Sequence, residues 1–317
     1  MIRMPGSSHT GPLPPLTAHQ QQVRDELERD VRLLSETIGP RHVFEYDALV
    51  SAAEFIERSL SDAGYTPARQ EYEVNNRVVW NIEAALTGTG TPDVASEIVV
   101  IGAHYDSVQI GIGDDCPGAN DNGTGVAAVL ALARHFAEHP PLQRTIRFVL
   151  FVNEEPPYFQ TSDMGSLVYA RACAQRNERI ASMLSLETMG YYTDEPKSQQ
   201  YPAPFGMLYP NTGNFITFVG DIGAGSLVRQ AIGVFREHAQ FPSEGGALPS
   251  FLPGVGWSDH WSFRQQGYPA IMITDTAPNR YPYYHTENDL ADHLDFDRLA
   301  HVVTGLEPVV VSLATSR

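Results

Sequence analysis

An apolar run that ends in two adjacent carboxylates is the feature that most constrains this chain. Residues 148–155 read FVLFVNEE, so five apolar residues are followed by Asn153, Glu154 and Glu155. The run has the length and composition of a buried β-strand, which would present both acids at its tip. Neighbouring carboxylates raise each other's pKa unless a cation lies between them. The pair therefore indicates either a solvated strand end or a metal site.

Short apolar strands alternate with amphipathic helices along the rest of the chain. Strands are predicted between residues 67 and 86 and at 98–102, 146–152, 183–186 and 270–274. Apolar residues recur at helical spacing in 23–38, 49–60, 124–139, 165–179, 226–238 and 296–313. Asp295 is the predicted N-cap of the last of these helices. The alternation predicts an α/β fold with mainly parallel core strands.

The chain shows no internal repeat and no convincing linker. Residues 1–16 are rich in Pro, Ser and Gly, and we expect them to form a poorly ordered tail. Residues 17–317 are then predicted to be a single domain. Within it, residues 188–222 and 239–257 have little periodicity and are expected to be long loops. Loops of this length are more often functional walls than spacers.

Composition excludes several classes of partner. The formal charge of −17 argues against nucleic acid and anionic membrane, because both require a basic face. The same charge favours cationic ligands, such as a metal ion or the ammonium end of a peptide. Cys116 and Cys173 cannot make a disulfide framework, so two unpaired thiols are expected. Nothing in the sequence indicates an oligomeric state.

The compartment is inferred from what the sequence lacks. It has no apolar run of the length of a membrane span, and its first residues lack the apolar core of a signal peptide. We therefore expect a cytoplasmic protein by default. A secreted or periplasmic location is the alternative if the sequence is that of a processed form.

Polar residues follow the predicted core strands. In open α/β sheets ligands collect at the carboxyl ends of the strands, and these ends offer two histidines and at least four carboxylates. Borderline divalent ions such as zinc accept imidazole and carboxylate ligands together. The sequence therefore predicts a di-metal centre at this edge of the sheet. The residues concerned are His104, Asp106, Asp121, Glu154, Glu155, Glu187 and His285.

Six motifs resemble those of a known family, the di-zinc exopeptidases. This family includes bacterial leucyl aminopeptidases and glutamate carboxypeptidase II, with glutaminyl cyclases as single-zinc relatives. The motifs occur in family order between residues 102 and 290. They are GAHYDS at 102–107, PGANDNGTG at 117–125, NEE at 153–155, LETMG at 186–190, SDHWSF at 258–263 and YYHTENDL at 283–290. The resemblance implies a three-layer sandwich, in which helices flank a mixed, mainly parallel sheet, and a single zinc-peptidase domain over residues 17–317.

The resemblance also implies two zinc ions and their ligands. His104 and Glu187 would hold one zinc, Glu155 and His285 the other, and Asp121 would bridge both. Asp106 lies two residues after His104, so its carboxylate is expected to accept the other imidazole N–H and fix the tautomer. Two positions depart from many relatives: Glu187 stands where they have Asp, and Asn120 where they have a second acid.

The resemblance also implies roles for residues beside the predicted ligands. Glu154 would be the general base that takes a proton from the attacking water and passes it to the leaving amine. Tyr284 matches the position whose hydroxyl supports the developing oxyanion. Ser258 and Asp259 are expected to form the pocket wall and to support the ligands. The aromatic residues expected in the specificity pocket are Tyr191, Tyr192, Tyr201, Phe205, Tyr209, Phe251 and Trp257.

The leading functional hypothesis is a zinc-dependent aminopeptidase that releases N-terminal residues from peptide substrates. An acidic protein suits a substrate that carries an ammonium group. A carboxypeptidase is an alternative, because Arg280 could grip a C-terminal carboxylate. A glutaminyl cyclase is a third possibility, although five ligands favour two metals and hydrolysis. A receptor-like relative without metals is the non-enzymatic alternative, and the intact ligand set speaks against it.

Overall fold

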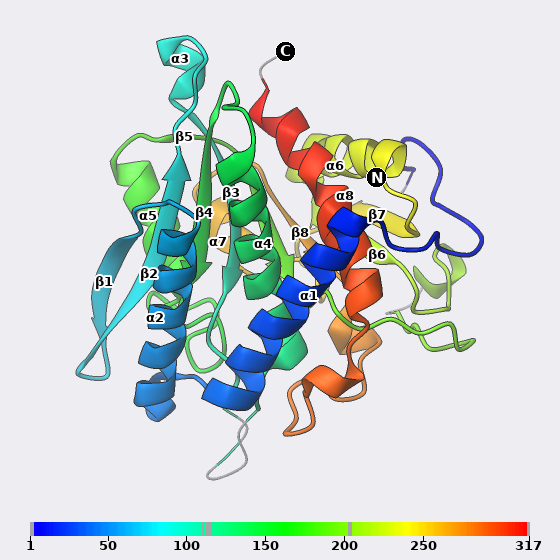
Figure 1. The fold of residues 1–317 in the computed structure, drawn as a ribbon, viewed down its shortest axis with the longest axis horizontal. Helices are drawn as coiled ribbons and strands as arrows, with labels where there is room; N and C mark the ends of the chain where they lie inside the picture. Colours follow the sequence, from blue (N-terminus) through cyan, green and yellow to red (C-terminus); the bar gives the residue numbers. More distant parts are fainter. Residues whose placement is uncertain (1–2, 110, 112–115, 202–204, 316–317) are drawn as a thin grey trace.

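The computed structural model describes residues 3–109, 111, 116–201 and 205–315 of the chain. Its centre is a twisted eight-stranded sheet with the strand order β1-β2-β4-β3-β5-β8-β6-β7 (Figure 1). The strands are β1 (Ala68–Val74), β2 (Arg77–Leu86), β3 (Glu97–His104), β4 (Thr145–Phe151), β5 (Arg179–Glu187), β6 (Ile216–Asp221), β7 (Ser243–Leu248) and β8 (Ala270–Thr274).

The sheet is mixed, with a parallel centre. Strands β4, β3, β5 and β8 run parallel to one another, and β6 pairs with β7 in parallel. The pairs β1–β2, β2–β4 and β6–β8 are antiparallel. The predicted mixed, mainly parallel sheet is therefore confirmed, and its carboxyl edge at β3, β4, β5 and β8 is where the polar residues follow.

Helices cover both faces of the sheet and make it the middle of three layers. The helices are α1 (Ala18–Arg32), α2 (Tyr46–Asp62), α3 (Pro92–Ala95), α4 (Gly125–Glu138), α5 (Gly165–Gln175), α6 (Gly225–His238), α7 (His260–Gln265) and α8 (Phe296–Ala314). The larger core cluster joins one sheet face to α1, α2, α4, α6 and α8. The smaller cluster joins the other face to α5 and α7 (Figure 1).

Strand β3 shows why both faces are buried. Val99 and Ile101 belong to the larger core, whereas Ile98 and Val100 belong to the smaller one. Successive side chains of a strand point to opposite faces, so a strand between two helical layers is apolar at nearly every position. Burial of both faces of the sheet therefore explains the continuous apolar runs in the sequence.

The prediction of long loops at residues 188–222 and 239–257 was partly wrong. Each of these stretches contains a strand, β6 or β7, that extends the sheet beyond β8. Strand β7 has the sequence SEGGAL, and glycine weakens a strand pattern. Its glycines serve close packing: a Cβ at Gly245 would lie 2.9 Å from Met4 Cγ, and one at Gly246 would lie 3.1 Å from Tyr209 Oη. Residues 202–204 of the first stretch lie outside the described residues.

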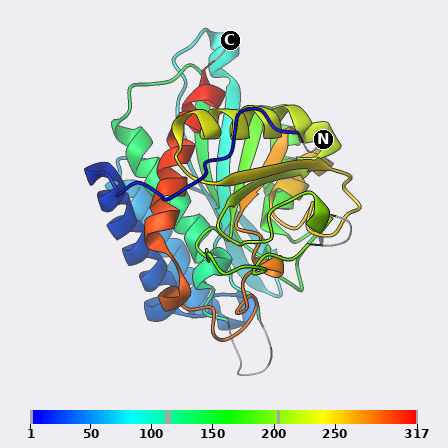
Figure 2. The same ribbon diagram turned by 90° about the vertical axis from the view of Figure 1, so that its right-hand side faces the viewer.

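The first residues of the chain contact the sheet. Residues 3–16 cross α8 and reach α6 and β7 (Figure 2). Ser243 N donates to Ser8 Oγ at 2.8 Å, and Arg236 donates to the Pro5 carbonyl at 3.1 Å. The expectation of a poorly ordered tail took no account of these contacts, and residues 1 and 2 of that tail lie outside the described residues. Within the described parts, no helix combines the length and apolar character that a membrane span requires.

Two local predictions are confirmed. Asp295 precedes α8 and accepts a hydrogen bond from Arg298 N at 2.9 Å, as an N-cap does. Cys116 and Cys173 are buried free thiols.

Candidate metal centre

The predicted polar residues converge because neighbouring parallel strands end together. Strand β3 ends at His104 and β5 ends at Glu187. In β4, Phe151 pairs with His104. Asn153 follows with a φ of 59°, a left-handed conformation that asparagine adopts more readily than most residues. This turn brings Glu154 and Glu155 back beside the histidine.

Two groups of potential metal ligands share Asp121. The first comprises His104, Asp121 and Glu187, and the second comprises Asp121, Glu155 and His285. His104 Nε2 lies 3.3 Å from Asp121 Oδ1 and 3.4 Å from Glu187 Oε2. His285 Nε2 lies 3.1 Å from the other Asp121 oxygen and 3.4 Å from Glu155 Oε1. The five predicted ligands thus lie in two pairs with one carboxylate between them, although their role as zinc ligands stays a prediction.

Four of the predicted ligand atoms are buried and lack hydrogen-bond partners. Among the described residues, none makes a hydrogen bond of good geometry to His104 Nε2, Asp121 Oδ1, Glu155 Oε1 or His285 Nε2. A buried polar atom without a partner costs about 1–3 kcal/mol, and four of them here come from the predicted ligands. Imidazole and carboxylate are donors that zinc accepts. The residues therefore fit a pair of divalent metal ions.

The shifted pKa values of the acids and histidines at the site also favour bound cations. Burial raises the pKa of Glu154 well above its usual range. Burial and the charge of Asp121 raise the pKa of Glu155 to about 7. Burial works against the charged forms of Asp121 and His285 too, but the close imidazoles of His104 and His285 lower the pKa of Asp121. The close carboxylates of Asp121 and Glu155 raise the pKa of His285 to about 10. Several acids in one buried space are costly without cations, so dications would stabilise the charged carboxylates.

Glu187 is held by two side chains. Ser258 Oγ donates to Glu187 Oε2 at 2.8 Å, and Asn122 Nδ2 lies 3.3 Å from the same oxygen. Both partners are fully buried. Ser258 therefore supports a predicted ligand directly, as its motif position implied.

Asp106 supports the site through both its main chain and its carboxylate. His104 Nδ1 is hydrogen-bonded to the main-chain oxygen of Asp106 at 3.1 Å, and the carboxylate is 3.6 Å away. The carboxylate instead accepts the N–H groups of Glu154 and Glu155, each at 3.1 Å. The Asp106 carboxylate therefore holds the turn after β4, and its predicted hydrogen bond to the His104 imidazole stays a prediction.

The other two predicted residues lie beside the centre. Tyr284 stacks on the ring of His285, with centroids 3.9 Å apart and planes 18° apart, and its burial raises the pKa of its hydroxyl. Asp259 is fully buried before α7, and burial raises its pKa to about 7. The oxyanion role of Tyr284 stays a prediction.

Sequence reasoning missed two residues that hold the Asp121 loop. Asp289 accepts the N–H groups of Asn120 and Asp121 at 2.8 and 3.0 Å. Arg41 is fully buried and donates to the carbonyls of Tyr105 and Gly118 at 2.8 and 2.7 Å. Asp289 lies four residues after His285, within a motif that could have indicated it. Arg41 lies outside every motif, and no local pattern marks it.

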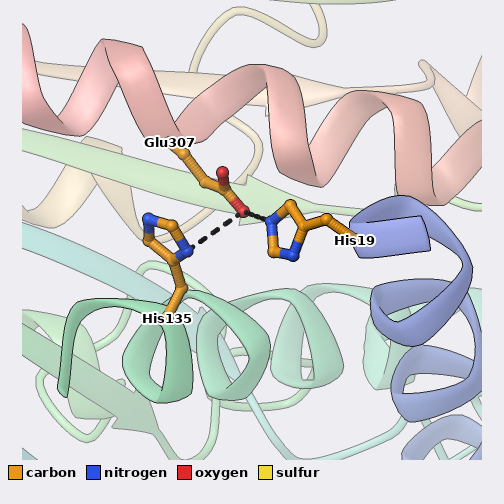
Figure 3. Close-up of side chains that lie close together, drawn as sticks. All are labelled: His19, His135 and Glu307. Carbon is orange, nitrogen blue, oxygen red and sulfur yellow. Dashed lines mark hydrogen bonds and ion pairs between the residues drawn. The ribbon is translucent and has the colours of Figure 1, made fainter. Parts of the chain in front are cut away.

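Another cluster of potential ligands lies away from this site, between α1, α4 and α8 (Figure 3). It comprises His19, His135 and Glu307. His19 Nε2 is hydrogen-bonded to Glu307 Oε1 at 2.7 Å, and His135 Nδ1 is 3.5 Å from the same oxygen. The hydrogen bond of His19 and the close contact of His135 with the same Glu307 oxygen link the three helices.

Comparison with known proteins identifies the family. The family model described as Peptidase family M28 matches residues 81–309, which include all the residues around Asp121. The chain belongs to Peptidase family M28. Membership in M28 makes it a hydrolase of the metallopeptidase class, and the predicted family resemblance is confirmed.

Two M28 relatives illustrate the similarity in sequence. The chain is 36% identical over 286 residues to a protein named "Uncharacterized protein YfbL" of Escherichia coli (strain K12), covering 89% of this chain and 86% of that one. It is 26% identical over 304 residues to a "Probable leucine aminopeptidase" of Arthroderma otae, covering 92% of this chain and 72% of that one.

Solved structures share the M28 fold. A zinc aminopeptidase from Bacillus subtilis superposes with a TM-score of 0.74 at 16% identity, covering 92% of this chain and 95% of that one. A glutaminyl cyclase from Porphyromonas gingivalis superposes with a TM-score of 0.63 at 16% identity, covering 92% and 98%. At this level of identity the likeness shows the fold alone.

Proposed function

We propose that this M28 peptidase is a di-zinc aminopeptidase that releases N-terminal residues from peptides. The observation that carries the proposal is the sharing of Asp121 by two ligand groups, in which four buried ligand atoms have no hydrogen-bond partner among the described residues. His104 and Glu187 would hold one zinc, Glu155 and His285 the other, and Asp121 both. Zinc held there supplies Lewis-acid chemistry, polarising a carbonyl and making water more acidic.

Glu154 is the proposed general base. It is buried beside the ligands, with an oxygen 3.9 Å from His104 Nε2, and the N–H of its own residue is fixed by Asp106. Burial raises the pKa of its carboxyl, which suits a group that must hold a proton between two steps. Glu154 would take the proton from the attacking water and deliver it to the amine that leaves. The hydroxyl of Tyr284 would donate a hydrogen bond to the developing oxyanion.

The surroundings of Arg280 favour an aminopeptidase over a carboxypeptidase. Arg280 is 7% exposed, donates to Gln199 Oε1 at 2.7 Å and to the Phe215 carbonyl at 2.9 Å, and does not line the pocket beside the site. No lysine or arginine is found among the described residues that line this pocket. The described lining residues therefore offer a C-terminal carboxylate no basic side chain, whereas they offer a substrate ammonium group the carboxylates of Glu187 and Glu244.

The test is a comparison of reporter substrates on protein of measured zinc content. Aminoacyl p-nitroanilides with a free amine should be hydrolysed, and their N-acetylated counterparts should not. Preferential cleavage of a C-terminal reporter would overturn the proposal in favour of a carboxypeptidase. Fewer than one zinc per chain after reconstitution, with no hydrolysis of any substrate, would favour a receptor-like relative.

A further inference from the structure

A pocket beside the candidate metal centre is lined by residues of the neighbouring strands β5, β8, β6 and β7. Glu187 and Tyr284 line its inner end. Its far end reaches β6 and β7, the two strands that the sequence did not predict. Of the aromatic residues expected there, Tyr201, Phe205, Tyr209 and Trp257 do line the pocket.

A row of four polar residues forms the floor of this pocket. Glu187 of β5 pairs with Thr274 of β8, Thr274 pairs with Thr217 of β6, and Thr217 pairs with Glu244 of β7. Residues paired in this way point to the same face of a sheet. All four line the pocket. Three strand spacings separate the ends of the row, about 14 Å, so Glu244 lies at a distance from Glu187 that only a long substrate side chain would span.

The two polar groups at the far end retain free hydrogen-bonding capacity. Thr217 is 9% exposed, and its hydroxyl has no partner among the residues that the structure describes. The carboxylate of Glu244 forms an ion pair with Arg236 at 3.9 Å, a distance too long for a hydrogen bond. Arg236 in turn donates to Ser243 Oγ and to the Ser243 carbonyl, at 3.1 and 2.6 Å. Burial raises the pKa of the Glu244 carboxyl more than the charge of Arg236 lowers it, so a second cation in the pocket would further stabilise the charged form.

The walls between the two ends are apolar and aromatic. Tyr201 and Tyr209 stack with centroids 5.7 Å apart, and Phe205, Phe215 and Trp257 also line the pocket. Aromatic faces bind aliphatic stems and attract cations. As noted for Arg280, the described lining residues include no lysine or arginine that would neutralise Glu244 from within the pocket.

We infer that this pocket selects peptides whose N-terminal residue is lysine or arginine, with the aliphatic stem along the aromatic walls and the cationic head on Glu244 and Thr217. The inference rests on the proposed aminopeptidase function and names its substrate class. A shorter apolar side chain such as leucine would enter the pocket but leave the carboxylate and the hydroxyl without partners. A site built to bind polar groups disfavours a substrate that leaves them unpaired.

The experiment compares p-nitroanilides of Lys, Arg, Leu and Met on zinc-loaded protein. The native protein should show a higher kcat/KM for Lys and Arg than for Leu and Met. In Glu244→Gln the ratio of kcat/KM for Lys to that for Leu should fall by about 10- to 100-fold, as expected for loss of a buried charge-assisted contact. Thr217→Val should lower the same ratio by a smaller factor. The control Glu237→Gln removes a carboxylate of α6 that does not line this pocket and should leave the ratio unchanged.

The outcomes separate the two proposals. Hydrolysis of Leu and Met substrates with Lys and Arg disfavoured would overturn this inference and leave the aminopeptidase proposal standing. A Lys-to-Leu ratio in Glu244→Gln equal to that of the native protein would also overturn it, and residual Leu hydrolysis shows that the variant is folded. If zinc-loaded protein cleaves none of the free-amine substrates, the aminopeptidase proposal fails and this inference fails with it.

Discussion

Ser258→Ala tests how strongly the surroundings of Glu187 set metal affinity. The substitution removes one hydroxyl, whose donated hydrogen bond to Glu187 Oε2 is 2.8 Å long. Both residues are buried, and the serine is fully so. Asn122 Nδ2 then remains as the weaker partner of that oxygen, at 3.3 Å. The carboxylate loses orientation and the partial neutralisation that the hydroxyl provides.

The expected magnitude follows from the kind of bond that is lost. A hydrogen bond to a charged group contributes about 1.5–3 kcal/mol, which corresponds to about 10- to 100-fold in a dissociation constant. Substitution of residues that support metal ligands has effects of the same size. We therefore expect zinc at the His104–Glu187 position to bind about 10- to 100-fold more weakly, while zinc at the Glu155–His285 position changes by much less.

Zinc affinity would be measured by competition with a chelator of known affinity. Ser262→Ala is the matched control, because Ser262 is also fully buried in the same motif but its hydroxyl pairs with Ser166, at 2.8 Å, and not with a ligand. Unchanged zinc affinity in Ser258→Ala, or an equal loss in the control, would refute the reasoning.

Two further predictions concern different parts of the molecule. Glu154→Gln should retain bound zinc and lower kcat by about 10²- to 10⁴-fold; loss of zinc instead would show that Glu154 is a ligand. Burial opposes the charge of Glu178, but hydrogen bonds from Arg147 and Arg176 lower its pKa to about 2. A carboxyl group whose pKa is lowered on folding stabilises the fold at pH values above its unfolded pKa of 4.5. This stabilisation is lost as the pH falls towards 2. Because solvent screens this partly exposed group, Glu178→Gln should reduce the free energy of unfolding by about 2 kcal/mol at pH 7, less than the full pKa shift would give. The difference should be smaller at pH 3, and a pH-independent difference in denaturant titrations would contradict this.

The sequence predicted the core of the sheet and the convergence of its polar residues. Both predictions rest on short-range patterns: apolar runs such as 146–152 mark buried strands, and parallel strands end at one edge. The positions of His104, Asp121, Glu155, Glu187 and His285 follow from that edge. The order of their motifs along the chain is sufficient to identify the family.

Features that depend on tertiary contacts were not predictable in this way. Strand β7 is glycine-rich because Met4 and Tyr209 pack closely against it from distant parts of the chain. Arg41 is buried by carbonyl groups of two loops, far from it in sequence. The hydrogen bonds of the Asp106 carboxylate depend on the turn after β4. In each case the cause is an approach of segments that no local pattern records.

Zinc stoichiometry tests the central claim, a two-metal centre built around Asp121, most directly. The zinc content per chain would be measured by mass spectrometry on the native protein and on Asp121→Ala, after reconstitution and removal of loosely bound ions. The claim predicts two zinc ions in the native protein and no tightly bound zinc in the variant. His135→Gln, in the helix-linking cluster of Figure 3, should keep both ions. One zinc in the native protein, or one tight zinc retained without Asp121, would contradict the claim.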